Sequence, residues 1–334
     1  MTKTIYDVAR HANVSVATVS RVINGHKVRD ELAERVRTSI SMLGYHPSRT
    51  AQRLRTSASH LWALIVPDFE NVFFTRLARG LEQVCRSDNS CVFIGSSDDD
   101  PDKEAQYLDI ALAERVAGVV IGPCSDVPSL DKLNDAGIPV VIVDRAIAQA
   151  GYDTVLTDNL AGGAMAARHL RAAGHREAIC IVGPPNPTSQ ARLDGFLAAT
   201  VPPLTVAAVI HGNNRVDGGY AAMRQVLARE IGFDALFVSN NLMAIGAIKA
   251  LDEVAGRRAA IGIVGFDLDQ VPLLSGERIA SVRQDPLKMG RIAGERLLLR
   301  QRDDAIAACA IELMPVLGPL DWDQGLLPER QAAR

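Results

Sequence analysis

The sequence predicts a small all-α head with a helix-turn-helix, followed by an α/β body of two doubly wound, parallel-sheet lobes. Two observations predict this fold class. Apolar residues recur at helical spacing in the first 46 residues, whereas apolar runs typical of buried strands alternate with helical segments from Leu61 onward. The 334 residues suffice for two or three domains with sizeable cores. We expect a helical head over residues 1–46, a linker segment over 47–60, and a core over 61–334.

Three short helices are expected in the head. The first follows Thr4, whose side chain can cap it, and its apolar residues recur at the spacing of one helical face. Ser15 is expected to cap the second helix and Asp30 the third, which Gly44 ends. Two short helices joined by a tight break and followed by a third form a helix-turn-helix, whose second helix enters the major groove of DNA.

The second helix carries side chains suited to reading base pairs. Val16 and Ala17 lie in its first turn, where they can contact thymine methyl groups, and Arg21 can donate to guanine one turn later. Two other interpretations stay open: Val16 as an exposed neighbour of the cap, and Arg21 as a phosphate contact without base readout. Polar side chains that suit phosphate oxygens lie on the same segment: Thr18, Ser20 and Asn24.

Basic charge is concentrated in the head. Residues 1–57 hold ten Lys and Arg side chains against four Asp and Glu, a net charge of +6. Because the formal charge of the whole chain is −3, the remainder carries −9. A basic head on an acidic body predicts a module that binds a polyanion, although a small domain can also be basic by chance.

The stretch TIYDVARHANVSVATVSRVING, residues 4–25, closely resembles the DNA-binding head of the LacI/GalR family of bacterial repressors, and the likeness continues through residues 31–55. The resemblance implies a homodimer that binds a palindromic double-stranded operator. It adds Thr4, Tyr6 and Ser15 to the expected DNA-binding residues.

The same resemblance implies a hinge helix over residues 47–55 that folds on operator DNA. Its Leu54 would wedge into the minor groove beside Leu54 of a second copy, and Arg49 and Arg53 would contact phosphates. The other interpretation of Leu54 is a linker leucine that packs into a core.

Ten apolar runs of the body are expected to be strands, and nearly all end at a polar residue or glycine. They cover residues 61–68, 91–97, 118–122, 139–145, 154–158, 178–183, 207–212, 235–241, 261–267 and 279–285. Helical segments separate most of them: 73–86, 103–115, 159–173, 217–229, 242–254 and 286–300. Apolar strands that alternate with helices predict buried parallel sheets, and ten strands are too many for one small sheet. Ligands of such sheets bind at the carboxyl ends of the strands.

Several classes of protein are disfavoured. The sequence has no dinucleotide-binding, P-loop or nucleophile-elbow motif, so we expect no enzyme and no cofactor. Its seven histidines show no metal-ligand spacing, and its five cysteines are scattered without a C-x-x-C, so we expect no metal. Neither a signal-peptide core nor an apolar run of about 18 residues is present, which predicts a cytoplasmic protein without a membrane span.

The body, roughly residues 61–317, resembles the regulatory core of the same family, which shares its fold with periplasmic sugar-binding proteins. The resemblance implies three crossings between the lobes. Lobe one would take about 61–156 and 286–315, and lobe two about 157–285 and 316–330. It also implies that a small effector, most simply a monosaccharide or sugar derivative, lies between the lobes.

The resemblance implies a set of effector contacts similar to that of ribose-type binders. Aromatic rings suit the apolar face of a sugar, and carboxylates, amides and Arg suit its hydroxyls. Asp144 and Asp267 could instead be strand-end caps, Asn240 a helix cap and Arg192 a surface charge. The expected contacts are Asn71, Phe73, Phe74, Asp144, Arg145, Arg192, Asn214, Asn240, Asp267 and Gln284.

Three departures from the common family pattern bear on the effector. Val72 follows Asn71 where many relatives have proline, and Asn241 stands where many have aspartate. Asn213 and Asn214 replace an acid and an aromatic that covers the ligand. Losing that ring argues against a planar purine and favours a small hydroxylated effector. We therefore expect a dimeric, effector-controlled repressor; the alternatives are a purine-dependent repressor and a cytosolic solute sensor without a DNA function.

Overall fold

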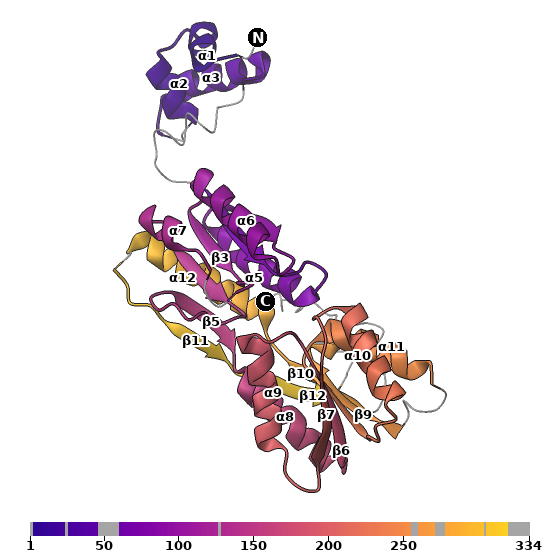
Figure 1. Ribbon diagram of the computed structural model, residues 1–334. Coiled ribbons are helices and arrows are strands. Elements are labelled where there is room, and N and C mark those ends of the chain that lie inside the picture. Colours follow the sequence, from indigo (N-terminus) through magenta and orange to yellow (C-terminus); the bar gives the residue numbers. More distant parts are fainter. Residues whose placement is uncertain are drawn as a thin grey trace, which may run out of the picture. The chain divides into compact units, whose positions relative to one another are not determined.

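The computed structural model describes residues 3–23, 26–45, 60–125, 128–254, 260–270, 278–303 and 305–319. The chain divides into two compact units, residues 1–59 and 60–334 (Figure 1). The expected hinge helix therefore lies outside the described residues. Among the described helices, none combines the length and the apolar character needed to cross a membrane.

The head consists of α1 (Ile5–Ala12), α2 (Val16–Ile23) and α3 (Asp30–Leu43). The side chains of Thr4 and Asp7 each bond the other residue's backbone N–H, which caps α1, and Ser15 Oγ accepts from the backbone N–H of Thr18 at 3.1 Å. Apolar side chains of all three helices, with Val8, Val19 and Val36 fully buried, form one small core. The predicted helix-turn-helix is confirmed.

The start of α3 corrects one expectation. Its N-cap is Arg29, which makes no side-chain capping bond, so Asp30 does not cap the helix. Asp30 lies instead in the first helical turn, where its negative charge is favourable beside the positive end of the helix dipole. Gly44 ends the helix in the left-handed conformation, with φ of 57°, as expected.

The first lobe of the body is a six-stranded sheet covered on both faces. Its strands are β1 (Leu61–Val66), β2 (Cys91–Ser96), β3 (Gly118–Ile121), β4 (Val140–Val143), β5 (Asp153–Thr157) and β11 (Ala310–Leu313). They are all parallel, in the order β11-β5-β4-β3-β1-β2. One face packs against α5 (Val72–Ser87) and α12 (Pro286–Arg302), the other against α6 (Pro101–Ala113) and α7 (Asp131–Asp135).

The second lobe repeats this plan. Its strands are β6 (Glu177–Val182), β7 (Thr205–His211), β8 (Ala235–Val238), β9 (Gly262–Phe266), β10 (Ile279–Arg283) and β12 (Val316–Pro319). Their order is β12-β10-β9-β8-β6-β7, and only β12 among these strands runs antiparallel. The covering helices are α8 (Asn159–Ala172) and α9 (Pro187–Ala199) on one face and α10 (Val216–Ala228) and α11 (Asn241–Asp252) on the other. A short 3-10 helix, η2 (Leu268–Gln270), follows β9.

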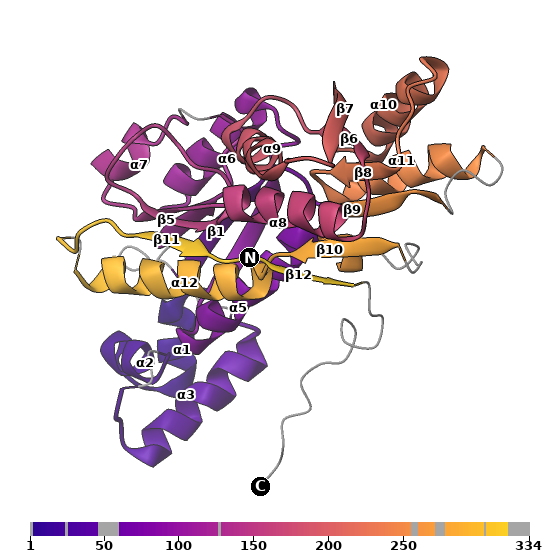
Figure 2. The same ribbon diagram turned by 90° about the horizontal axis from the view of Figure 1, so that it is seen from below.

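The predicted pair of doubly wound lobes is confirmed, and all ten expected strands are present. The chain passes between the sheets three times: after β5, after β10, and between β11 and β12 (Figure 2). Two strands, β11 and β12, and two helices, α7 and α9, are present in addition to the expected elements. Five strands of each lobe have the same relative order, and residues that follow the carboxyl ends of strands in both sheets line a common cavity.

Candidate functional site

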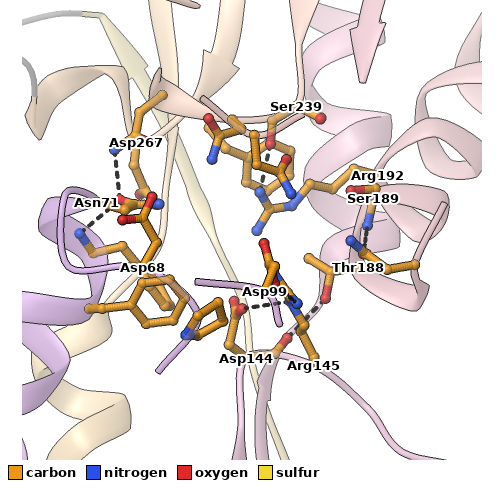
Figure 3. Close-up of a pocket in the computed structure, with 18 of the residues that line it drawn as sticks. Asp68, Asn71, Asp99, Asp144, Arg145, Thr188, Ser189, Arg192, Ser239 and Asp267 are labelled. Atoms are coloured by element: carbon orange, nitrogen blue, oxygen red, sulfur yellow. Dashed lines mark hydrogen bonds and ion pairs between the residues drawn. The ribbon is translucent and has the colours of Figure 1, made fainter. Parts of the chain in front are cut away.

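The cavity between the two lobes has a volume of about 60 Å³. Its wall is built from segments that follow the strands of both sheets (Figure 3). All ten residues that the sequence predicts as effector contacts line it: Asn71, Phe73, Phe74, Asp144, Arg145, Arg192, Asn214, Asn240, Asp267 and Gln284. The topology thus brings together residues up to 213 positions apart in the sequence.

An ion-pair group forms the part of the wall that follows β4. Arg145 Nη1 donates to Asp99 Oδ1 at 2.5 Å, and Arg145 Nε lies 3.8 Å from Asp144 Oδ2. Asp144 has a positive φ of 66°, which turns its side chain out of the strand direction. Burial raises the pKa of the Asp144 carboxyl, and the charge of Arg145 opposes that effect. The Arg145 charge is therefore already compensated by carboxylates of the same lobe.

Arg192 enters the cavity from α9 in the second lobe (Figure 3). Its side chain is buried, so the surface-charge interpretation of this residue is wrong. Nε donates to Asn159 Oδ1 at 2.7 Å, Nη1 donates to the carbonyl of Ser239 at 2.6 Å, and the guanidinium lies 3.8 Å from the centre of the Phe266 ring. Burial lowers the pKa of Arg192, whereas the charges of Asp144 and Asp267 raise it. A guanidinium held by neutral acceptors keeps charge available for a ligand.

Asp267 follows β9 and is 3% exposed. Its two carboxylate oxygens accept from the backbone N–H of Gln284 at 2.9 Å and from Gln284 Nε2 at 2.6 Å. Gln284 Oε1 in turn accepts from Thr157 Oγ1 at 2.7 Å, at the point where the chain leaves the first lobe. Burial raises the pKa of Asp267 to about 6, although both hydrogen bonds from Gln284 lower it.

Three asparagines line the cavity; two of them cap helices, and the third donates a hydrogen bond to one of these caps. Asn240 Oδ1 accepts from the backbone N–H of Met243 at 3.0 Å, so the cap interpretation of Asn240 is confirmed, and the residue lines the cavity as well. Asn71 caps α5 in the same way, through the backbone N–H of Phe73. Asn241 Nδ2 donates to Asn71 Oδ1 at 3.0 Å. The amide that replaces the common aspartate therefore joins the two lobes directly.

The aromatic residues of the wall present little ring surface. Phe73 and Phe74 are buried in the core of the first lobe as an edge-to-face pair with ring centres 5.0 Å apart. Asn214 lines the opposite wall with a positive φ of 62°. The cavity is consequently lined mostly by hydrogen-bonding groups rather than by stacking faces.

Sequence reasoning missed part of the wall. Thr188 Oγ1 donates to the carbonyl of Asp144 at 3.0 Å, another hydrogen bond between the lobes. Asp68 lies two residues after the end of β1, so its position already indicated a site residue, whereas most of the others lie in loops or on α9. The wall residues outside the predicted set are Pro67, Asp68, Asp99, Asn186, Thr188, Ser189, Asn213, Arg215, Ser239, Asn241 and Phe266; Asn213 and Asn241 among them are two of the departures from the common family pattern.

The head presents most of its expected DNA contacts on the surface. Thr4, Tyr6, Ser15, Ala17 and Arg21 are exposed, and Val16 and Thr18 are half-buried. Ser20 is different: it is 7% exposed and lies inside the head, which argues against the expected phosphate contact. Four expected contacts lie outside the described residues: Asn24, Arg49, Arg53 and Leu54.

One basic side chain of the head has a structural role. Arg35 on α3 donates through Nη2 to the carbonyls of Ala12 at 2.6 Å and Asn13 at 3.1 Å. Asn13 has a positive φ of 50° in the turn between α1 and α2. Arg35 therefore holds the turn of the helix-turn-helix, and its charge supports the fold of the head.

Comparison with known proteins decides the family. Residues 4–48 match the family described as bacterial regulatory proteins, lacI family, and residues 62–295 match a periplasmic binding protein domain. The chain is also 32% identical over 327 residues to the HTH-type transcriptional repressor PurR of Klebsiella pneumoniae (strain 342), covering 94% of this chain and 95% of the relative. The chain belongs to the LacI family of bacterial regulatory proteins. It is a DNA-binding regulator with an effector-binding core.

Solved structures agree with the fold of this LacI-family regulator. The lac repressor dimer bound to operator and the anti-inducer ONPF matches with a TM-score of 0.82 and 24% identity, over 95% of this chain and 98% of that chain. A LacI family transcriptional regulator from Enterococcus faecalis V583 with bound ribose matches with a TM-score of 0.69 and 28% identity, over 77% of this chain and 96% of that chain.

Proposed function

We propose that this LacI-family regulator is a repressor whose operator affinity is controlled by a small, hydroxyl-rich effector, a monosaccharide or sugar derivative. The observation that carries this proposal is the set of buried charges in the cavity. Arg192 and Asp267 of the second lobe and Asp144 of the first offer a rigid donor fork and two acceptor groups within one cavity. Adjacent hydroxyl groups need this combination of donors and acceptors.

A planar purine corepressor is the second candidate, favoured by the likeness to PurR repressors. The lining of the cavity weighs against it. A planar base is best held by an aromatic face, and the three phenylalanines of the wall, Phe73, Phe74 and Phe266, are only 3%, 5% and 1% exposed. Asn214 supplies an amide where family relatives carry a covering ring. The ribose complex of the E. faecalis relative, at 28% identity, supports the sugar class.

We further propose that two copies of the chain bind a palindromic operator and that neither copy catalyses a reaction. Helix-turn-helix proteins read two half-sites as symmetric dimers, with the second helix of each in the major groove. The exposed residues Ala17 and Arg21 on α2 support this placement. The +6 charge of residues 1–57 supports binding to phosphates.

Selection of binding sites from a random DNA pool tests the proposal. The full chain is expected to recover inverted repeats, and residues 56–334 alone are expected to bind none of them. Both proteins should keep the same affinity for a sugar effector, because the cavity lies wholly within residues 60–334. Recovery of sites without two-fold symmetry, or operator binding by residues 56–334, would contradict the proposal.

A further inference from the structure

A second hollow lies beside the effector cavity and shares two wall residues with it. Its volume is about 480 Å³, within the range of small-molecule sites. Asp68 of the first lobe and Arg215 of the second line both spaces, so the two spaces adjoin at this pair. The rest of the second hollow is built by the first lobe, from the loop after β1, the end of β2 and one side of α6. The effector contacts predicted from the sequence lie outside it.

The floor of the second hollow holds an aromatic ring in a fixed position. Tyr107 on α6 lies over Gly95 of β2, where an added Cβ would come within 2.6 Å of the ring. The absence of a side chain at Gly95 therefore lets the ring pack flat against the strand. Tyr107 contacts the lobe core and is only partly buried, so ring surface is left for the hollow. Phe69 and Ile110, which are exposed, add apolar surface to the same wall.

Polar groups at the rim of the second hollow are held in place before any ligand arrives. Asp98 accepts from Lys103 Nζ at 2.7 Å and from Ser96 Oγ at 2.9 Å, and these bonds lower the pKa of its carboxyl. With Asp68 and Glu70, the lining carries three carboxylates against two cations, Lys103 and Arg215. This excess of negative charge is unfavourable for a phosphate group. A ring with one apolar face and several hydroxyls suits the combination of an aromatic floor and a polar rim.

We infer that the second hollow is a subsite for the second ring of an extended effector, a disaccharide or glycoside. The first ring occupies the cavity among Arg192, Asp144 and Asp267. The glycosidic link passes between Asp68 and Arg215, and the second ring lies on Tyr107. The inference rests on the proposed function, because it extends a sugar site that the buried charges define.

Calorimetric titration of the full chain tests this inference with six probes: ribose, glucose and galactose, and the disaccharides cellobiose, maltose and lactose. At least one disaccharide is expected to bind about tenfold more tightly than any of the three monosaccharides. Tyr107→Ala should remove about tenfold of the disaccharide affinity, the effect of losing one aromatic contact, and leave monosaccharide binding within about twofold of wild type. Tyr107→Phe should retain the disaccharide affinity, because it keeps the ring.

A second variant keeps the test decisive if Tyr107→Ala fails to fold. Gln106 is exposed and lines the same hollow, so Gln106→Trp should fill the hollow without disturbing the core and block disaccharides selectively. Tyr220→Ala, on α10 and away from both spaces, is the matched control and should change neither affinity. Monosaccharide binding with no preference for a disaccharide would overturn the subsite and leave the proposed function intact. Binding of hypoxanthine or guanine with no binding of any sugar would overturn both.

Discussion

Asp267 has a carboxylate whose protonation depends on burial. Its pKa of about 6 lies above the value of about 3.9 for an unfolded aspartate, so folding favours the protonated form. The contribution of the Asp267 carboxyl to the free energy of unfolding is fully present below the pKa of the unfolded state. It is lost as the pH rises through the pKa of the folded state. Wild type should therefore lose stability through Asp267 between pH 4 and pH 7.

Asp267→Asn removes this titration, and its effect on stability should depend on pH. Relative to wild type, the free energy of unfolding of the variant should rise by about 2–3 kcal/mol between pH 4 and pH 7. Urea unfolding of both proteins at several pH values measures the difference. Losing one hydrogen bond to Gln284 shifts the free energy of unfolding of the variant by the same amount at every pH, so it does not change how that free energy depends on pH. Parallel curves for the two proteins would contradict the assignment of the raised pKa.

Arg21 is exposed on α2, one helical turn after the first-turn residues that face the same way. Arg21→Ala should cost about 1–3 kcal/mol of discrimination at one base pair of each half-site, because a bidentate contact to guanine is lost. Fluorescence anisotropy with the selected operator and with single-base variants measures this loss.

The matched control for Arg21 is Arg37→Ala, since Arg37 on α3 is exposed and pairs only with Glu34 among the described residues, at 3.7 Å. It should leave base preference unchanged. If Arg21→Ala weakened binding equally on operator and random DNA, the residue would contact phosphate and the base-reading role would be wrong.

At the scale of elements, α8 and α9 pack through a reciprocal pair of glycines. A Cβ at Gly163 on α8 would lie 2.0 Å from the carbonyl oxygen of Arg192, and one at Gly195 on α9 would lie 2.0 Å from the carbonyl oxygen of Leu160. The two helix backbones therefore approach each other too closely for any larger side chain. This approach fixes the position of Arg192, because its own carbonyl forms part of the contact.

Gly163→Ala should move α9 and lower the free energy of unfolding by about 1–3 kcal/mol, the usual cost of overpacking. Effector affinity should fall with it, because the Arg192 guanidinium moves with the helix. Gly232→Ala is the control, since its nearest described neighbour would lie 3.7 Å from the added Cβ. Thermal unfolding and calorimetric titration give the two values. An unchanged effector affinity in a destabilised Gly163→Ala would show that α9 does not position Arg192.

The central strands that the sequence predicted are fully buried, whereas the missed elements β11 and α9 have mixed burial patterns or bury polar residues. Central strands such as β4 and β9 are buried on both faces and read as continuous apolar runs. β11 lies at the edge of its sheet, and its exposed and half-buried residues alternate over only four positions, so it gives no such run. α9 buries Ser189, Arg192 and Gly195 among a few apolar residues, which conceals the apolar periodicity of a helix.

The candidate site was predictable as far as strand ends define it. Asp144, Asp267 and Gln284 directly follow strands, so the topology of parallel sheets places them together. Asp99 and Thr188 were missed because Asp99 lies in the turn between β2 and α6 and Thr188 lies in the first turn of α9, so their contacts with Arg145 and Asp144 depend on tertiary packing.

At the scale of the whole molecule, the lobes are joined by three crossings of the chain and by hydrogen bonds across the cavity. Asn241 donates to Asn71, and Thr188 donates to the carbonyl of Asp144. An effector can change the arrangement of the lobes only if it binds two arrangements with different affinity. An effector that contacts Arg145 of the first lobe and Asp267 of the second has that property, because both contacts require the lobes to be close.

The central claim is that the buried charges of the cavity bind a sugar effector that controls operator binding. The most direct test measures the operator affinity of wild type and Asp267→Ala at one fixed salt concentration, during titration with sugars and with hypoxanthine or guanine. The account predicts that a sugar changes the operator affinity of wild type, and that Asp267→Ala binds operator normally but does not respond. An unchanged sugar response in Asp267→Ala, or a wild-type response to the purines alone, would contradict the claim.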